Sequence, residues 1–219
     1  PLVRNEPIFS LFLNPSLFFK KSPAEQEILI RNLESILGTI SSGEKVGDVI
    51  LKADLEKSPK IVIERGIDTS VAIEIKGLND DSLSIDNDYR RHYLYGPVAS
   101  HVLGYTGVGA LDRTLEGKNG LELYYDSFLK GEDGKFIVGR DAKGNTLFQR
   151  TESEPISGAS LYTTIDSELQ NYFYERMRLG LKSLGRDAGV GIALNPQTGE
   201  VLSMVSLPSF DNNLFTLNK

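Results

Sequence analysis

The sequence predicts an α+β protein in which an elongated region of small mixed sheets and helices precedes an incomplete α/β sandwich. Short segments with alternating apolar or β-branched residues predict the strands, and capped segments with apolar residues three or four apart predict the helices. The last helix precedes a hairpin over residues 189–206 whose strands keep no polar face, with Pro196 and Gly199 in its turn. Such strands are typically buried on both sides, so we expect the sequence to break off where a domain begins.

The first region contains alternating strand and helix signals. Ser22-Pro23-Ala24-Glu25 is typical of a helix start, with a serine N-cap, a proline in the first turn and a glutamate placed for a capping box. Gly38 is expected to end that helix. The other expected elements are a strand over residues 7–13, a short helix over 46–55, a strand over 60–64 and a helical turn over 71–75 capped by Asp68.

Residues 79–88 are acidic and polar, and we expect them to form a solvated loop. A calcium-binding loop is the alternative reading. The spacing of Asp80, Asp81, Asp86 and Asp88 does not fit the Asp-x-Asp-x-Asp-Gly pattern, and no closing glutamate follows. The loop interpretation is therefore preferred.

Two further helices have recognisable starts. Asn119 is placed to cap a helix over residues 121–129, and Asp166 is placed to cap a longer one. In the longer helix Leu169, Phe173, Met177, Leu181 and Leu184 form one apolar face. The remaining expected elements are an extended segment over 89–95, a short helix over 98–103, a hairpin of strands over 135–140 and 145–150, a linker over 155–158 and a strand over 160–164.

Composition limits the classes of function. The formal net charge of −6 and the absence of a basic stripe argue against a nucleic-acid partner. The chain has no cysteine, so neither disulfides nor thiolate metal sites are expected. His92 and His101 are the only histidines and have no carboxylate at metal-binding spacing, so we expect them to be structural, with no metal or other cofactor. No apolar run is long enough to predict a membrane-spanning helix.

Two Ser-x-x-Lys matches, Ser42 with Lys45 and Ser127 with Lys130, are the candidates for serine acyl-transfer chemistry. A chain with this serine and lysine content yields about one such match by chance. Neither is accompanied by Lys-Thr-Gly, Lys-Ser-Gly or Ser-x-Asn, and hydrolase-elbow, P-loop and zinc-protease motifs are absent. We therefore expect no catalytic residue in this chain.

Four ordered sequence boxes carry a family resemblance. The first runs from Arg91 through Tyr93 to Gly96 and is followed by residues 99–107, which include Gly104. The others contain Gly117, Gly120, Glu122, Gly131, Gly134, Asp141 and Gly144, then Asp166 and Gln170, and finally Asn195 to Leu202 with Pro208 to Asp211. With these residues the chain resembles the region before the active site of class B penicillin-binding proteins, the membrane-anchored D,D-transpeptidases that cross-link peptidoglycan.

The resemblance implies a non-catalytic pedestal of the dimerisation type over residues 1–157 and the beginning of a transpeptidase domain over 158–219. It implies a pedestal outside the cytoplasmic membrane that positions the transpeptidase domain and contacts the lipid II polymerase of the SEDS family and other elongation or division proteins. The membrane helix would precede Pro1. The catalytic Ser-x-x-Lys, Ser-x-Asn and Lys-Thr/Ser-Gly motifs would follow Lys219, so only the absent domain would meet peptidoglycan precursors. An independent module that binds peptidoglycan or a partner protein is the alternative.

The box residues are accordingly expected to be structural. Their glycines are expected at turns and helix ends that need a positive φ. We expect Arg91 to pair with Glu122, because a carboxylate in the first turn of a helix also suits the helix dipole. Leu94 and Asn212 stand where the family has proline, so local turns are expected to differ there.

Overall fold

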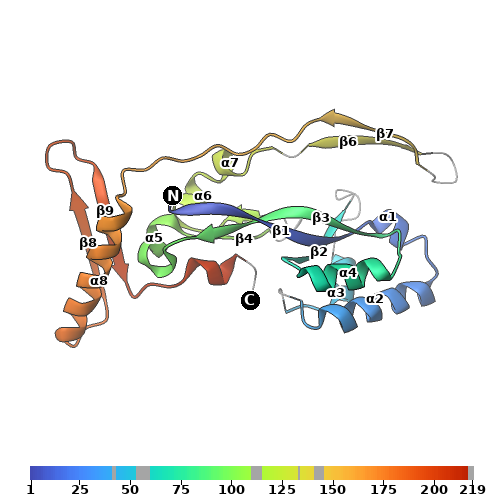
Figure 1. Cartoon of the computed structure of the whole chain (residues 1–219), viewed down its shortest axis with the longest axis horizontal. Coiled ribbons are helices and arrows are strands. Elements are labelled where there is room, and N and C mark those ends of the chain that lie inside the picture. The colour runs from blue at the N-terminus through green and yellow to red at the C-terminus, as the bar shows by residue number, and fades with distance from the viewer. Residues whose placement is uncertain (41–42, 53–59, 110–114, 133, 141–145, 217–219) are drawn as a thin grey trace.

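The computed structural model describes residues 1–219 apart from 41–42, 53–59, 110–114, 133, 141–145 and 217–219 (Figure 1). The elements are β1 (Val3–Leu13), α1 (Pro15–Phe18), α2 (Pro23–Leu37), α3 (Val46–Lys52), β2 (Ile61–Arg65), α4 (Thr69–Gly77), β3 (Leu83–Tyr93), η1 (Gly96–Ala99), α5 (Ser100–Leu103), β4 (Thr106–Val108), β5 (Leu115–Gly117), α6 (Gly120–Tyr124), α7 (Asp126–Leu129), β6 (Lys135–Arg140), β7 (Thr146–Ser153), α8 (Ser167–Ser183), β8 (Gly189–Leu194), β9 (Val201–Leu207) and η2 (Asn212–Phe215). The fold is mixed α+β, as the sequence predicts.

The molecule is elongated (Figure 1). Helices α1–α4 and the sheet β2-β1-β3 form a lobe at one end, and α8 with β8 and β9 lies at the other. Strands β1 and β3 pair antiparallel without a break from Val3 opposite Tyr93 to Leu13 opposite Leu83. This long ribbon therefore carries one fixed strand register from the lobe to the middle of the molecule.

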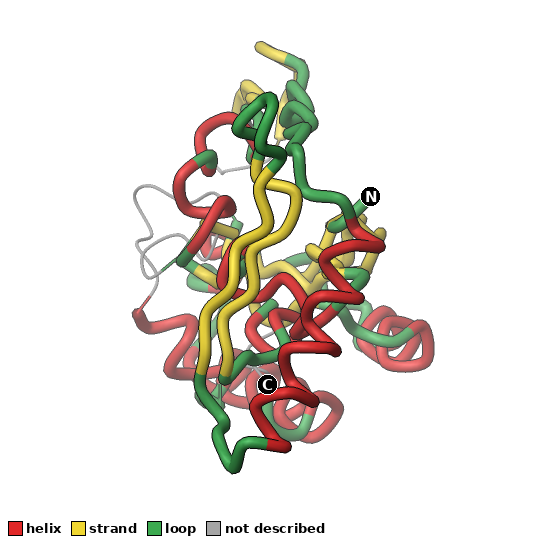
Figure 2. Tube along the Cα trace, turned by 90° about the vertical axis from the view of Figure 1, so that its left-hand side faces the viewer, coloured by secondary structure: helices red, strands yellow, loops and turns green. Residues whose placement is uncertain are grey.

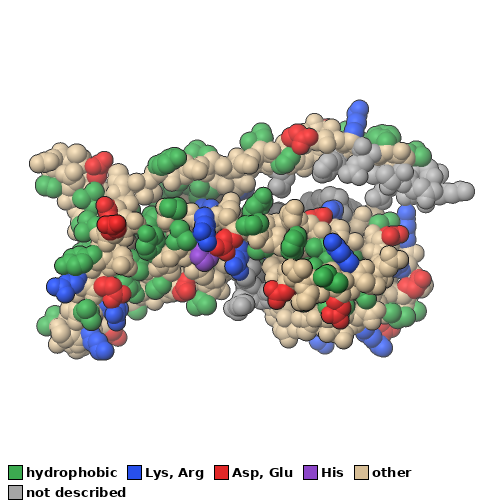
Figure 3. All heavy atoms as spheres, viewed as in Figure 1, with side chains coloured by type: hydrophobic (Ala, Val, Ile, Leu, Met, Phe, Trp, Pro, Cys, Tyr) green, Lys and Arg blue, Asp and Glu red, His purple; other side chains and the backbone are tan. Residues whose placement is uncertain are grey.

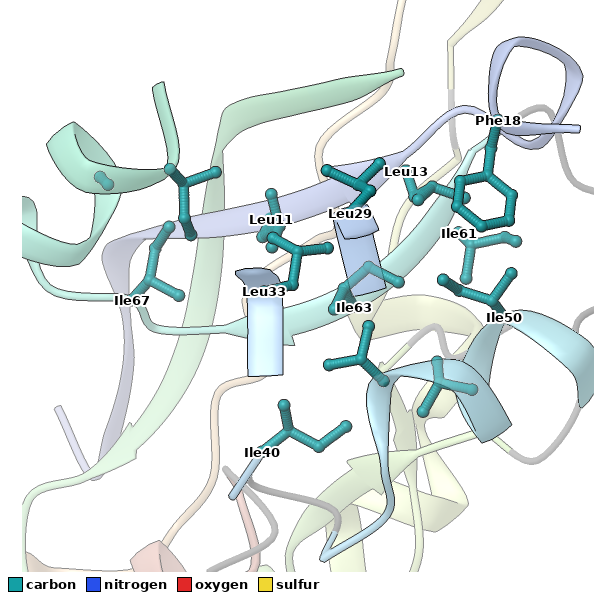
Figure 4. Packing of buried hydrophobic residues seen from close by; sticks show 14 residues of the cluster. Leu11, Leu13, Phe18, Leu29, Leu33, Ile40, Ile50, Ile61, Ile63 and Ile67 are labelled. Atoms are coloured by element: carbon teal, nitrogen blue, oxygen red, sulfur yellow. The ribbon is translucent and has the colours of Figure 1, made fainter. Parts of the chain in front are cut away.

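The main hydrophobic core lies between the sheet and the helices α2, α3 and α4 (Figure 4). Leu11, Leu13, Leu33 and Ile63 are fully buried there. Burial of an aliphatic side chain of this size stabilises the fold by about 1.5–3 kcal/mol. The N-terminus of α2 is fixed by the predicted capping box, in which the amide of Ser22 donates to Glu25 at 2.8 Å and the amide of Glu25 donates to Ser22 Oγ.

The acidic stretch is not the solvated loop that the sequence predicts, because most of it lies in β3. Asp88 accepts a hydrogen bond from Ser10 Oγ at 2.7 Å and pairs with Arg65, and Asp86 pairs with Lys60 at 2.7 Å. Ser10 is fully buried beneath these groups. The acidic side chains thus pair with residues on or next to β1 and β2, and local sequence patterns do not predict such distant partners.

Charges on the face shown in Figure 3 are mixed, and basic and acidic side chains lie next to each other among the residues that are coloured. Glu6 illustrates the pairing. Arg4 donates to it at 2.8 Å and Arg90 at 2.9 Å, and these bonds hold the pKa of Glu6 below its usual range. Such a surface has no single-sign field to attract a polyanion.

The predicted helix over residues 121–129 is two short helices, α6 and α7, which meet at Tyr125. The Asp126 side chain turns back and accepts a hydrogen bond from the amide of Gly117 at 2.7 Å. Asn119 caps α6 as expected, through a bond from the amide of Gly120. The break between the two helices thus coincides with a bond that joins Asp126 to the end of β5.

Strands β6 and β7 form the expected hairpin, which extends along the side of the molecule (Figure 1). The strand expected over residues 160–164 is absent, and these residues run in an irregular extended path to α8. Thr164 Oγ1 instead donates to the carbonyl of Val201 at 2.7 Å, and the amide of Asp166 donates to that of Leu202 at 2.9 Å. The path is held by these two bonds in place of a strand ladder.

Helix α8 packs on one face of the β8–β9 hairpin, where Phe173 and Met177 lie against Gly191 (Figure 2). No described residue of the chain covers the opposite face of β8. Val190 is 72 % exposed there and Ile192 52 %. Among the described residues one apolar face of the hairpin is therefore open, and the burial on both sides that is typical of such strands is reached on the α8 face alone.

Replacing Leu33 by alanine is expected to lower the free energy of unfolding by about 2–5 kcal/mol, because the fully buried side chain would leave a cavity in the lobe. Urea denaturation measures the change. Ile28→Ala on the same helix is the matched control, since Ile28 is 59 % exposed and the substitution should cost much less. Equal losses in the two variants would contradict this placement of the core.

Candidate functional site

Residues of the first three boxes converge on one region, here called the junction, where the end of β3 meets η1, α5, β4, β5 and α6 and where α8 and β9 approach. Arg91 lies on β3 and Glu122 in the first turn of α6. The Arg91 Nε donates to Glu122 Oε1 at 3.0 Å, so the expected ion pair is present. The Glu122 side chain is 5 % exposed and that of Arg91 21 %, which makes the pair largely buried. Arg91 also donates to Asn5 of the paired strand β1.

Tyr93 ends β3 and is 1 % exposed. Its hydroxyl oxygen accepts a hydrogen bond from the amide of Thr106 at 3.0 Å, which attaches β3 to β4. Burial, and next the negative charge of Glu122, raise the pKa of the Tyr93 phenol. The ring and hydroxyl therefore act together as a neutral, buried anchor.

Positive φ and close main-chain contacts together account for the box glycines that the structure describes. A Cβ at Gly104 would overlap the carbonyl of Asn119, and one at Gly117 would overlap the carbonyl of Glu122. Gly96, Gly104, Gly120 and Gly131 do have positive φ, as expected. Gly117 and Gly134 do not, so the expectation is wrong for them, and close packing is the reason each lacks a side chain. Asp141 and Gly144 lie outside the described residues.

Gln170 joins α8, β9 and η1 through all the polar groups of its amide. Its Nε2 donates to the carbonyls of Val98 and Met204, and its Oε1 accepts from Ser203 Oγ and the Met204 amide, each at 2.8 Å. Gln170 is 1 % exposed. A fully satisfied buried amide of this kind fixes orientation as well as distance. Asp166 caps α8 as expected, accepting from the amides of Glu168 and Leu169.

The contacts described in this region join structural elements to one another. Ser127 and Lys130 are exposed, and Lys130 pairs with Asp126, so they form no buried nucleophile and base. Ser42 lies outside the described residues. Within the described part of the chain no three His, Asp or Glu side chains are grouped to hold a metal ion. None of the helices described there is long and apolar enough to cross a bilayer.

Sequence reasoning missed several residues of the junction. Asp126 and Ser203 were not identified by any role, although a serine within the apolar segment of β9 is a visible signal of a buried polar contact. The Asn213 side chain bonds to the main chain of Tyr93, 120 positions earlier, and no local sequence pattern predicts this contact. The exposed residue His101 forms a T-shaped ring pair with Phe210, with the two ring centroids 5.1 Å apart.

The family model for the penicillin-binding protein dimerisation domain matches residues 1–163. The chain belongs to this family. The resemblance to class B penicillin-binding proteins is thereby confirmed, and the box residues of the junction fall inside or next to the dimerisation domain. The match ends shortly before α8.

Curated relatives of this dimerisation domain include peptidoglycan transpeptidases. The chain is 31 % identical over 169 residues to the probable peptidoglycan D,D-transpeptidase PenA of Neisseria meningitidis, which covers 75 % of this chain and 28 % of that protein. It is 36 % identical over 174 residues to the stage V sporulation protein D of Bacillus subtilis, with 78 % and 26 % covered. The chain thus spans about a quarter of the length of these relatives.

Solved structures show the same fold. Penicillin-binding protein 2 of Helicobacter pylori, in a complex with MreC, matches 98 % of this chain and 41 % of that chain with a TM-score of 0.68 and 23 % identity. Penicillin-binding protein 2X of Streptococcus thermophilus matches 99 % of this chain and 34 % of that chain with a TM-score of 0.57 and 22 % identity. At these identities the likeness extends to the fold alone.

Removing one partner of the Arg91–Glu122 pair, as in Arg91→Met or Glu122→Gln, is expected to cost about 2–4 kcal/mol of unfolding free energy, because the other charge stays largely buried. A double-mutant cycle should give a coupling above about 1 kcal/mol. The exposed pair Glu27–Arg31 on α2 is the control, with an expected coupling of about 0.3–0.5 kcal/mol. Equal coupling in the two cycles would refute a stabilising role at the junction.

Tyr93 is expected to make stability sensitive to alkaline pH. Its folded-state pKa is raised above the unfolded value of about 10, so its contribution is complete below pH 10 and is lost as the pH rises toward the folded pKa. Urea denaturation between pH 8 and 11 should show that the free energy of unfolding falls as the pH rises, and that it falls less in Tyr93→Phe. Tyr124→Phe, at a site that is 79 % exposed, should keep the wild-type slope, and a wild-type slope in Tyr93→Phe would contradict the assignment.

Proposed function

We propose that this chain is the pedestal of a peptidoglycan D,D-transpeptidase and that it positions the transpeptidase domain for cell-wall synthesis. Residues 1–157 form the pedestal in this proposal and 158–219 the first elements of the transpeptidase domain. The observation that carries it is the buried amide of Gln170, which bonds α8 and β9 to the carbonyl of Val98 in η1. A connection of this kind gives the terminal elements a defined direction relative to the rest of the chain.

The junction residues act in this proposal as supports rather than catalysts. The Arg91–Glu122 ion pair, the close contacts of the glycines and the buried amide of Gln170 all hold helices and strands together. None of them presents an activated nucleophile. The serine nucleophile, its base and the oxyanion-hole strand would belong to the part of the protein after Lys219. The open apolar face of β8, with Val190 and Ile192, would be covered by that part.

The pedestal also has partners in this proposal. Family resemblance supports contact with the lipid II polymerase of the SEDS family and with elongation or division proteins, and the H. pylori relative was solved in a complex with MreC. The location would be the periplasmic or external side of the cytoplasmic membrane, with an anchor preceding Pro1. Mixed surface charge fits protein partners better than a nucleic acid.

The test uses the full-length protein in cells that depend on it. Gln170→Leu should remove the bonds to Val98 and Ser203, misorient the domain and abolish complementation. The purified variant should still be acylated by a fluorescent penicillin, since the nucleophile lies elsewhere. Gln197→Leu, in the exposed turn after β8, is the matched control and should complement. Complementation by Gln170→Leu would overturn the proposal, and so would loss of acylation together with loss of growth.

A further inference from the structure

The segment after β9 returns to the pedestal and docks on it through two asparagines. Residues 208–216 pass from the hairpin to the end of β3 and to α5, where η2 forms (Figure 1). Asn212 is completely buried and Asn213 partly so. Both side chains bond to main-chain groups of the pedestal more than 100 positions earlier in the sequence.

Asn213 acts in place of a neighbouring strand. Its Oδ1 accepts a hydrogen bond from the amide of Tyr93 at 2.9 Å, and its Nδ2 donates to the carbonyl of Tyr93 at 3.0 Å. Because β3 is the edge strand of the order β2-β1-β3, these two groups of Tyr93 point away from β1. The amide is itself held in place by Asp211, which accepts from Nδ2 at 3.0 Å.

Asn212 closes the C-terminal end of α5. Its Nδ2 donates to the carbonyl of Ser100 at 3.1 Å and also to that of Gly104. The Ser100 carbonyl also accepts the main-chain amide of Gly104 at 2.8 Å, so Asn212 is a second donor to it. At the carbonyl of Gly104, beyond the helix end, the Asn212 amide supplies a donor from outside the helix. Its Oδ1 is buried and has no hydrogen-bond partner among the described residues. The docked state therefore carries one unsatisfied polar group, and its bonds are not optimal.

The two parts that these bonds join each have a core of their own, and Val98 of η1 packs against the core of the terminal part. The lobe core around Leu33 contains no residue after Ile85. The core of the terminal elements consists of Tyr174, Val205 and Leu207, with Phe173, Met177 and Leu181 from α8 and Val98 from η1 packed against it. The covalent connection between the parts is the irregular segment over residues 157–165. Loss of the docking bonds would thus leave each part with its own core. The parts would stay joined by residues 157–165, by Val98 and by the rings of Phe210 and Phe215 against His101 and Tyr105.

We propose that Asn212 and Asn213 form a lock that fixes the orientation of residues 166–216 on the end of β3 and on α5, and that opening the lock lets this unit pivot about residues 157–165 while both parts stay folded. The inference rests on the proposed function, in that the orientation it controls is that of the transpeptidase domain. Four hydrogen bonds from the two side chains cross to the pedestal, whereas Gln170 contributes one to Val98. The asparagines are therefore the larger share of the polar attachment.

Spin-label distance measurements test the lock directly. The chain has no cysteine, so two introduced cysteines label without background. Lys76→Cys on α4 and Lys182→Cys on α8 are exposed and report on the two parts, while Lys76→Cys with Leu123→Cys on α6 reports within the pedestal. Each pair is measured in the otherwise unchanged chain and in the variants Asn213→Ala, Asn212→Asp and Asn171→Ala. Asn171 is an exposed residue of α8 and provides the matched control.

The unchanged chain and the control should give one narrow distance distribution for the pair that joins the two parts. Asn213→Ala removes the bonds to Tyr93, and Asn212→Asp places a carboxylate against two carbonyls, so both should broaden that distribution by about twofold or more. The pair within the pedestal should stay narrow in every variant. Unchanged width between the parts would overturn the proposal, and so would broadening of both pairs, because the asparagines would then support the pedestal fold itself. Neither result depends on acylation or on growth, so failure here is separable from failure of the proposed function.

Discussion

The main-chain contact at Gly104 is the constraint on which the middle of the molecule depends. No side chain fits there or at Gly117, because the carbonyls of Asn119 and Glu122 occupy the space. With the two main chains in contact, α5 and α6 lie at one separation, and Glu122 is brought to Arg91 on β3. The ion pair is therefore a consequence of backbone packing, and its burial in turn makes separation of the elements costly.

Strand β3 carries this arrangement to both ends of the molecule. Its pairing with β1 has no irregularity, so a slip of one residue would turn Leu11 out of the lobe core and Tyr93 out of the junction at the same time. The charges of β3 take part in the same constraint, since Asp88 and Arg90 pair toward β1 and β2. One strand thus fixes the lobe, which is apolar, relative to the junction, which is polar.

Local signals in the sequence were sufficient for elements whose causes are local. The capping box at Ser22, the N-cap at Asp166 and the two terminal hairpin strands were all predicted. The pairing of Arg91 with Glu122, 31 positions away, was predicted from the family boxes and not from a local pattern. Other features with distant causes were not predicted. Asp88 lies in a strand because its partners come from β1 and β2, and Asn213 belongs to the junction because of Tyr93. Periodicity within a window contains no information about such partners.

A junction held by hydrogen bonds restricts the relative orientation of the parts it joins more than a junction held by apolar contacts does. Apolar surfaces attract without a preferred direction, so two parts joined in that way keep their proximity but have several similar orientations. The amides of Gln170 and Asn213 accept and donate along fixed directions, and a rotation that breaks one bond leaves a buried group unpaired. The polar junction therefore selects a single orientation although its apolar core is small. When only part of such a hydrogen-bond network is formed, the buried polar groups that remain unpaired destabilise it. In the proposed lock, loss of some bonds would therefore favour release of residues 166–216 as a unit.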